Sequence, residues 1–373
     1  MLNKTEIDLE TNPIRIFLYN LGAEKYLLHI QYHHICMDGW SLGLLLSKLW
    51  GYYDRPDTIG MQPEFDYERY VQHLNVVKQS EDSQAYWRST VCLEAVMSLP
   101  TQKNAGHRTL NCIEHQLGSE LMRKLERYCK KNGFTLAHAI YAAWSILLAK
   151  YNDAGDICFG TTVSGRDVGF AGDIEESIGL YIQTPPLYVN GLTGEDTVAD
   201  VLQKIKDATL ARESHKAYPL ADIQAIHRIR HPLFDSIVVI ENYPLAKRLS
   251  ELSTHVDITN SSIEEKTNFD LCLEVNLLEA ALLRLSYNMG KYPHYVIANG
   301  LKHIEQVLDT IANHDQQTLS RLCLLGEQDY QRLVVDFNHR PPTSFRHTHL
   351  IDAWREAVVR HHDAVALSQQ ARQ

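Results

Sequence analysis

The sequence has no excess of positive charge and no block of lysine or arginine. Among its 373 residues, 46 are acidic and 36 are basic, which gives a formal charge of −10. Proteins that hold nucleic acid do so mainly through clustered cations facing the phosphates. Nucleic acid is therefore excluded as a partner.

Cysteine is scarce, and long apolar runs are missing. The seven cysteines are scattered with no Cys-x-x-Cys pair, which indicates reduced thiols and not a disulfide framework or a zinc site. The opening MLNKTEIDLE has no apolar stretch after a basic start, so no secretory signal is expected. No apolar run is long enough to span a bilayer. We expect a cytoplasmic globular protein without membrane contact.

The apolar content and the patterning predict a large α+β protein. Hydrophobic residues make up 45% of the chain, enough for two or more domain-sized units. The pattern mixes strands and helices without a regular β-α-β alternation or a G-x-G-x-x-G, so a dinucleotide-binding fold is not expected. The elements it predicts are a hairpin over 14–32, helices over 41–54, 83–91, 119–153 (broken at Asn132-Gly133), 292–314 and after 345, and strands within 156–166, 178–189, 234–244 and 282–288.

A polar cluster, HHICMDG, lies where the hairpin meets the first long helix. The second strand, KYLLHIQY, leads into His33 and His34, and the helix is expected to start after Gly39 with Ser41 as its N-cap. Because successive strand residues face opposite sides, one histidine should point into a cleft and the other should be buried. Histidine is suited to proton transfer near neutral pH. Asp38 is placed to fix the loop by pairing with a cation, and Gly39 permits a tight backbone.

Four other interpretations of this cluster compete with that of a catalytic histidine. A histidine near a strand end is often a satisfied structural residue. A metal site from H-x-x-x-D has no H-E-x-x-H to support it, so no metal is expected. The serine of VSGRD is not in a G-x-S-x-G elbow, so a serine hydrolase is rejected. Cys36 has apolar neighbours that would raise its thiol pKa, so a cysteine nucleophile is rejected as well.

Six segments in a fixed order carry a resemblance to a known family. HHICMDGWS resembles the HHxxxDG signature, and SQAYWR resembles the helix that follows it. YNDAGDICFGTTVSGRD and IGLYIQTPPLYV resemble the fourth and fifth motifs, and HKAYPLADIQ and PLFDSIVVIENYP resemble the last two. Together they resemble the condensation domains of non-ribosomal peptide synthetases, of the ordinary elongation type and not the epimerisation or cyclisation types. The tail resembles the linker and first helix of an adenylation domain.

This resemblance implies a two-lobed fold like that of chloramphenicol acetyltransferase, with a tunnel between the lobes. Carrier proteins would bring a donor aminoacyl or peptidyl thioester and an acceptor aminoacyl thioester, each on a 4′-phosphopantetheine arm, and a peptide bond would form between them. The chain itself would bind no cofactor. Its partners would be the donor and acceptor carrier proteins and the adjacent adenylation domain. The amino acids joined, and the configuration of the donor, are not specified by these motifs.

Residue roles follow the matching motif positions. His34 would be the active-site residue at the centre of the tunnel, acting as a base or by orienting the amine. His33, Asp38 and Gly39 would be structural residues around it. Weaker candidates for lining the tunnel or binding substrate are Trp40, Ser164 and Asn242.

The chain also departs from the family pattern. The opening motif and the R-H-E-x-L-R-T segment are absent, so the first lobe is expected to be incomplete. Because the missing arginine normally pairs with the motif aspartate, Asp38 is expected to be an uncompensated, partly buried charge. Tyr181, Gln183 and Tyr188 replace the common Phe, Asn and Arg of the fifth motif.

These observations predict three regions and leave three functions open. The remainder of the first lobe would span 1–80, the second lobe 81–320, and the linker with the start of the adenylation domain 321–373. Peptide-bond formation is the first choice. A catalytically incomplete remnant that serves as a carrier-docking module is the second, and a CoA-dependent acyltransferase is the third.

Overall fold

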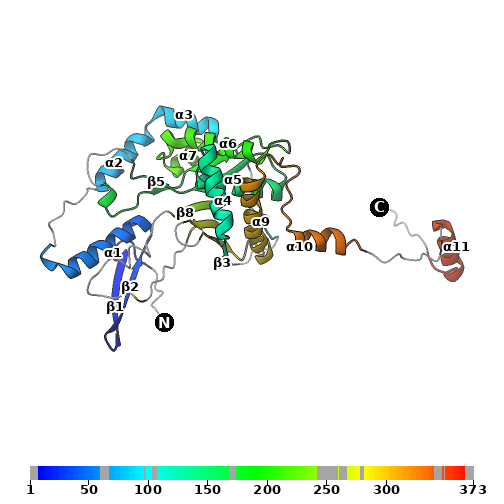
Figure 1. Ribbon diagram of the computed structural model, residues 1–373, viewed down its shortest axis with the longest axis horizontal. Helices are drawn as coiled ribbons and strands as arrows, with labels where there is room; N and C mark the ends of the chain where they lie inside the picture. Colours follow the sequence, from blue (N-terminus) through cyan, green and yellow to red (C-terminus); the bar gives the residue numbers. More distant parts are fainter. Residues whose placement is uncertain are drawn as a thin grey trace, which may run out of the picture. The chain divides into compact units, whose positions relative to one another are not determined.

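The computed structural model describes residues 7–58, 67–95, 98–102, 107–167, 174–241, 259, 267–277, 281–339, 347 and 349–365. The chain divides into two compact units, Met1–Leu324 and Leu325–Gln373. The ribbon in Figure 1 follows the elements of each unit. Within the described residues, no helix is both long and apolar enough to cross a membrane.

The first unit begins with the predicted hairpin. β1 (Ile14–Gly22) pairs antiparallel with β2 (Lys25–Tyr32). The two loop residues, Ala23 and Glu24, both have positive φ, at 50° and 58°, as a tight turn that follows the right-handed twist of the strands requires. The alternating β-prone residues predicted this hairpin correctly.

One face of the hairpin is apolar and exposed. Ile16 and Leu18 of β1 are 54% and 67% exposed, and Tyr26 of β2 is 59% exposed. Ile16 and Leu18 lie opposite Ile30 and Leu28 in the antiparallel register, so their side chains share one face. A two-stranded sheet with such a face is prone to association.

Replacing Ile16 and Leu18 together with threonine is therefore expected to reduce self-association. Threonine keeps the strand propensity while removing the apolar surface, so light scattering and binding of a hydrophobic dye should fall to about half or less. The matched control is Phe17→Thr, since Phe17 faces the other side of the same strand and stacks on His29. It should destabilise the hairpin without lowering dye binding. Unchanged scattering in the double variant would contradict the prediction that the chain self-associates through this face.

The hairpin leads into α1 (Gly39–Asp54), which begins two residues earlier than predicted. Its N-cap is Asp38, whose side chain accepts a hydrogen bond from the Ser41 backbone N–H at 2.8 Å. The prediction of Ser41 as N-cap was wrong, because the carboxylate of Asp38 already satisfies that N–H. A short 3₁₀ turn and two helices follow: η1 (Pro56–Thr58), α2 (Tyr67–Lys78) and α3 (Glu81–Thr90).

The centre of the first unit is a mixed six-stranded sheet. The strand order is β3-β10-β9-β8-β4-β7; β8 runs parallel to β4 and β9, and the other pairs are antiparallel. The strands are β3 (Leu110–Gln116), β4 (Ile157–Thr161), β7 (Pro186–Val189), β8 (Ser236–Glu241), β9 (Leu271–Asn276) and β10 (Leu282–Asn288). Pro186 opens β7, which lies at the edge of the sheet, where a strand tolerates proline.

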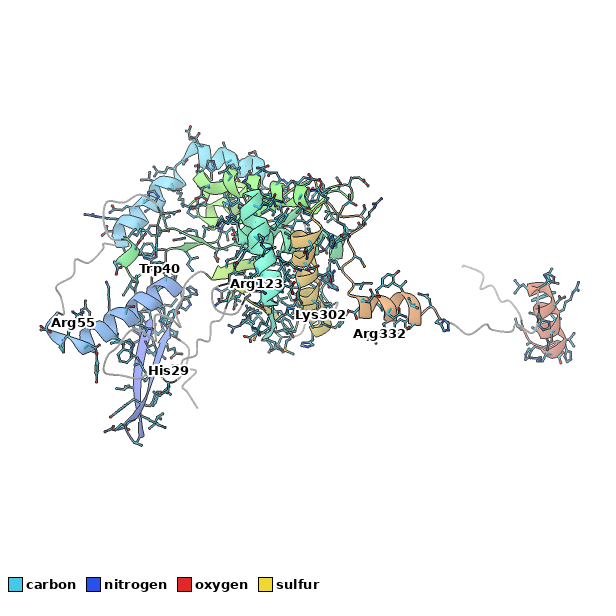
Figure 2. All side chains as sticks on the ribbon, in the orientation of Figure 1. His29, Trp40, Arg55, Arg123, Lys302 and Arg332 are labelled. Carbon is cyan, nitrogen blue, oxygen red and sulfur yellow. The ribbon has the colours of Figure 1, made fainter. Side chains whose placement is uncertain are left out.

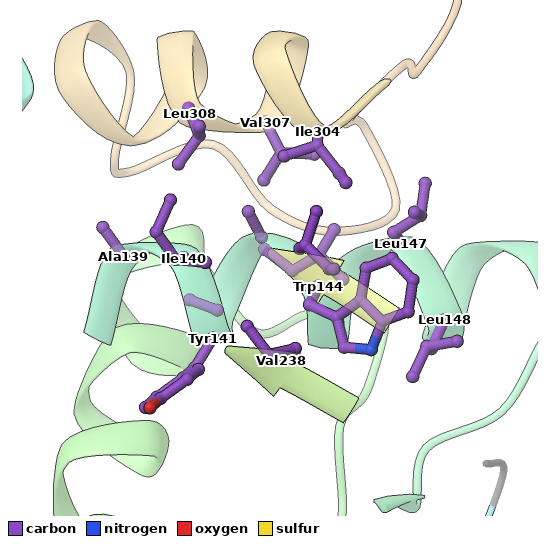
Figure 3. Packing of buried hydrophobic residues seen from close by; sticks show 14 of the residues in the cluster. Ala139, Ile140, Tyr141, Trp144, Leu147, Leu148, Val238, Ile304, Val307 and Leu308 are labelled. Carbon is purple, nitrogen blue, oxygen red and sulfur yellow. The ribbon is translucent and has the colours of Figure 1, made fainter. Parts of the chain in front are cut away.

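Four helices enclose the main core with this sheet. They are α4 (Ser119–Asn132), α5 (Leu136–Asn152), α6 (Val198–Arg212) and α9 (His294–Asn313). Figure 3 shows Trp144 and Leu147 of α5 between α9 and Val238 of β8. The predicted break is real: Gly133 ends α4 with a φ of 70°.

A second, smaller core contains residues of α3, α7 (Leu220–Ile226) and the strands, and η3 (Glu213–His215) precedes α7 in the chain. Trp87 of α3 is fully buried and donates from Nε1 to the carbonyl of His215 at 3.2 Å. Phe234, at the start of the β8 region, is buried in the same cluster and stacks on Phe269. Contacts in and around this core therefore hold η3 and α7, which follow α6, against α3 and the sheet.

A narrow hairpin, here called the arm (residues 162–184), projects between β4 and β7. It contains β5 (Val163–Ser164), the 3₁₀ turn η2 (Ile174–Glu176) and β6 (Ile182–Gln183), with β5 and β6 antiparallel. Residues 168–173 of the arm lie outside the described part of the chain. Residues of the arm contact Asp38 and Ser41, which follow the turn that contains His33 and His34 (the histidine turn).

The second unit contains α10 (Glu327–Tyr330), a π-helical turn over Gln331–Asp336 and α11 (Leu350–Arg360). α11 confirms the helix predicted after the proline-marked linker. Its apolar residues are exposed, with Trp354 at 64%. That this unit begins an adenylation domain stays a prediction.

Candidate active site

The two histidines lie in a turn and not in the strand. β2 ends at Tyr32, the His33 N–H donates to the Pro13 carbonyl at 3.0 Å, and the Cys36 N–H donates to the His33 carbonyl at 3.0 Å. Both imidazoles are exposed. The expectation that one would be buried was wrong, because the alternation of a strand no longer applies after Tyr32.

His33 makes a hydrogen bond within the turn. Its Nδ1 accepts a hydrogen bond from the Ile35 backbone N–H at 3.1 Å, so a neutral ring carries its proton on Nε2. This bond closes the turn on its own side chain, in the manner of a side chain that replaces a backbone acceptor. His34, the next residue, is exposed.

Asp38 is the buried anchor of this turn. Its side chain accepts the Ser41 N–H at 2.8 Å and, from the arm, the Tyr181 N–H at 2.9 Å. Its own N–H donates to the Gly179 carbonyl at 3.2 Å. With 2% of its surface exposed, the carboxylate is held by backbone N–H groups of two segments far apart in sequence.

Arg166 supplies the positive charge that Asp38 needs. Its Nη2 lies 3.4 Å from Asp38 Oδ1, and both side chains are buried. The expectation of an uncompensated Asp38 was wrong: the arginine comes from the arm and not from the segment that the sequence lacks. Burial lowers the pKa of the Arg166 guanidinium, and the charge of Asp38 opposes that effect.

The Arg166 guanidinium is also a hydrogen-bond hub. Nη1 donates to the carbonyls of Ile174 at 2.5 Å and Ser177 at 2.9 Å, and Nη2 donates to Ser41 Oγ at 2.8 Å. The guanidinium carbon lies 4.1 Å from the centre of the Tyr181 ring, within range of a cation–π contact. It therefore folds the arm back on itself while pairing with Asp38.

Ser41 completes the connection between α1 and the arm. Its Oγ donates to the Gly179 carbonyl at 2.6 Å and accepts from the Gly179 N–H at 3.0 Å. Since Ser41 is fully buried, each bond is made without competition from water. Its role differs from the predicted N-cap but belongs to the same site.

Trp40 and Gly39 form the start of α1, and Trp40 contacts the arm. The Trp40 indole N–H donates to the Glu175 carbonyl at 3.0 Å, and Lys48 Nζ donates to the Glu176 carbonyl at 3.1 Å. Figure 2 shows Trp40 on α1. Gly39 is the first residue of the helix, and a Cβ there would meet nothing within 4 Å. A tight backbone is therefore not the reason for a glycine at this position.

The remaining candidates divide into one described residue and one that is not. Ser164 is exposed in β5, and its Oγ accepts the Arg166 N–H at 3.2 Å. Ser164 thus helps to shape the arm beside Arg166. Asn242 lies outside the described residues.

Two tyrosines of α2 pack on Tyr181 of the arm, a feature that the motifs did not reveal. The rings of Tyr67 and Tyr70 lie 5.2 and 4.7 Å from that of Tyr181. Tyr67 donates to the Leu180 carbonyl at 2.8 Å, and burial raises its pKa to about 12. A Cβ at Gly179 would lie 2.6 Å from the Tyr67 ring, so the close packing itself requires a glycine.

The buried contacts of Asp38 hold the turn that contains the exposed His34 imidazole. In the described residues, no group of three histidine, cysteine or acidic side chains is placed to hold a metal ion. What the described site offers is an exposed imidazole, His34, four residues before a buried and hydrogen-bonded carboxylate, Asp38.

Comparison with known proteins identifies the family. The Condensation domain family model matches residues 2–334. Tyrocidine synthase 2 of Brevibacillus parabrevis is 30% identical over 339 residues, which is 88% of this chain but only 9% of that protein.

Two solved structures share the fold. The X-domain from teicoplanin biosynthesis aligns with a TM-score of 0.71 at 19% identity, covering 86% of this chain and 77% of that one. The condensation domain of the Monacolin K polyketide synthase aligns with a TM-score of 0.69 at 16% identity, covering 84% and 76%. The expected chloramphenicol-acetyltransferase-like α+β fold is thereby confirmed. The chain belongs to the condensation-domain family of non-ribosomal peptide synthetases, whose members are amide-bond-forming enzymes of the acyltransferase type.

Proposed function

We propose that this chain joins a donor aminoacyl or peptidyl thioester to the amine of an acceptor aminoacyl thioester, with His34 at the reacting centre. Condensation domains work with carrier-protein and adenylation domains in multidomain synthetases. For this chain we infer donor and acceptor carrier proteins, each presenting its substrate on a 4′-phosphopantetheine arm. The chain itself then needs no bound cofactor.

The observation that carries this proposal is the way the turn is held. Asp38, Ser41 and Arg166 are buried and bonded to one another and to Gly179. His34 stands four residues before Asp38 with an exposed imidazole. A fixed backbone under an accessible histidine is what the orientation of two tethered reactants requires.

The reaction balances without any further reagent. The acceptor nitrogen attacks the donor carbonyl carbon, and a tetrahedral oxyanion forms. The carbon–sulfur bond then breaks, the amine nitrogen gives up one proton, and the departing thiolate takes one. His34 serves this step by receiving the amine proton or by orienting the amine. Because a thioester is already activated, orientation alone supplies much of the rate.

The direct test uses the purified chain with loaded donor and acceptor carrier proteins. Mass spectrometry should detect a dipeptidyl group on the acceptor carrier that depends on the chain. The control replaces the acceptor with an unloaded carrier, which offers no amine and should give no product. A folded chain that binds both carriers yet forms no dipeptide would overturn the proposal and leave a docking module. Product formed from free acyl-CoA in place of the donor carrier would instead indicate a CoA-dependent acyltransferase.

A further inference from the structure

A buried arginine at the end of α6 forms no ion pair with a carboxylate of the described residues. Arg212 is the last residue of the helix and is 3% exposed. In the described part of the chain no acidic oxygen forms an ion pair with it, and the neighbouring Glu213 pairs instead with Lys216 at 2.5 Å. Burial lowers the pKa of the Arg212 guanidinium. Its printed hydrogen bonds go to neutral oxygens, and the nearby charge of Glu213 favours the charged form without forming an ion pair. A buried charge without an ion-pair partner is costly, so its retention calls for a reason.

The guanidinium binds the root of the arm. Nη1 donates to Thr161 Oγ1 at 2.7 Å, to the Pro186 carbonyl at 3.2 Å and to the Pro185 carbonyl at 3.5 Å. Thr161 is the last residue of β4 and Pro186 the first of β7. The Thr161 N–H also donates to the Pro185 carbonyl, at 3.1 Å. Arg212 therefore joins the outgoing and returning chains where the arm leaves the sheet.

Two prolines remove backbone donors at this point, so the hydrogen bonds from Arg212 contribute more to holding the two strands together. Gly160 pairs with Pro186 in the antiparallel register, but neither Pro185 nor Pro186 has an N–H to donate to the neighbouring strand. The ladder between β4 and β7 is therefore weakened at the root of the arm. The Arg212 side chain supplies donors from a third element at this point.

Described residues of the arm next to β5 and β6 hold the active-site turn. Arg166, Gly179 and Tyr181 bind Asp38 and Ser41 at the start of α1. We propose that Arg212 is a positioning residue, which sets the placement of the His34 turn by joining the two ends of the arm whose residues bind Asp38 and Ser41. Its effect on the reaction rests on the proposed condensation function, whereas its effect on the arm does not.

A simpler role for Arg212 would be to complement the dipole of α6. A cation near a helix C-terminus is favoured in general. The bonds described above, however, go to Thr161, Pro185 and Pro186, which lie outside α6. The dipole role predicts an effect on α6 and the global fold, while the positioning role predicts an effect on the arm.

The experiment compares Arg212→Met and Arg212→Lys with the unchanged chain. Methionine fills similar volume without donors, and lysine keeps the charge with a single donor atom. Lys150→Met is the matched control, because Lys150 is the basic residue in the last turn of α5. Three readouts are taken: the thermal midpoint, amide hydrogen exchange of peptides covering 38–44 and 174–183, and the dipeptide-forming rate with loaded carriers.

In Arg212→Met we expect exchange in the two peptides to speed up by about tenfold while the midpoint shifts by only a few degrees. The condensation rate should fall by about tenfold or more, with Arg212→Lys intermediate and Lys150→Met unchanged. Exchange that rises equally throughout the chain with a lower midpoint would overturn the proposal in favour of a purely structural role. Unchanged exchange at 38–44 and 174–183 would overturn it too. If no variant, the unchanged chain included, forms dipeptide, the condensation proposal fails, and the exchange result still decides the role of Arg212.

Discussion

Replacing His34 with alanine is expected to lower the rate of dipeptide formation about a hundredfold or more, in line with the loss of a residue that moves a proton at the reacting centre. The side chain is exposed, so its removal should leave the free energy of unfolding unchanged. The measurement is a single-turnover assay with both carriers loaded, in which the dipeptidyl-carrier is followed by mass spectrometry.

The neighbouring histidine provides the matched control. His33 is also exposed, but its Nδ1 accepts the Ile35 N–H, so His33→Ala loosens the turn without removing the proposed reactive group. We expect a smaller loss, of about tenfold, from His33→Ala. Equal losses from the two variants would mean that the turn and not the His34 imidazole matters for the rate.

A third variant separates the two roles left open for His34. Glutamine can still hydrogen-bond to the acceptor amine, but it cannot take its proton. If His34 is a base, His34→Gln should be as slow as His34→Ala, and the pH profile of the unchanged chain should show a rise that both variants lose. If His34 mainly orients the amine, the glutamine variant should keep most of the rate.

The sequence predicted most of the elements that local pattern determines. The hairpin over Ile14–Tyr32 and the paired helices α4 and α5 follow from alternation, apolar spacing and a glycine break. No strand was predicted at β3 or β9. β3 is an edge strand with Glu114 and Gln116 among its residues, so its propensity is weak and its pairing with β10 determines its conformation.

The sequence motif indicated the candidate residues of the site, but it did not indicate the distant residues that contact them. The motif located His34 and Asp38, but the partner of Asp38 stands 128 positions away in the chain. The motif match that includes the Ser-Gly-Arg sequence assigns no role to Arg166, because nothing in its spacing shows that the arm returns to α1. The stack of Tyr67, Tyr70 and Tyr181 depends equally on tertiary contact. Such pairs follow from the packing of whole elements, which local periodicity does not specify.

Arg166→Ala is expected to lower the free energy of unfolding of the first unit by about 3–5 kcal/mol, because it leaves the buried Asp38 charge without its cation. Both side chains are buried, with exposures of 7% and 3%. The loss also removes the donors to Ile174, Ser177 and Ser41. Urea unfolding followed by tryptophan fluorescence measures it, since Trp87 and Trp144 are fully buried in this unit.

An exposed pair serves as the comparison. Arg284 lies 2.7 Å from Glu114, and the two side chains are 41% and 47% exposed, so Arg284→Ala should cost no more than about 1 kcal/mol. A double variant, Asp38→Asn with Arg166→Met, then tests the cause. It removes both charges and keeps an acceptor for the Ser41 or Tyr181 N–H, so it should be more stable than Arg166→Ala by about 1–3 kcal/mol. A double variant no more stable than the single one would show that the loss comes from the hydrogen bonds of Arg166 and not from the buried Asp38 charge that is left without a cation. In either case the arm is what stabilises the histidine turn, since every described contact of Arg166 joins α1 to the arm or the arm to itself.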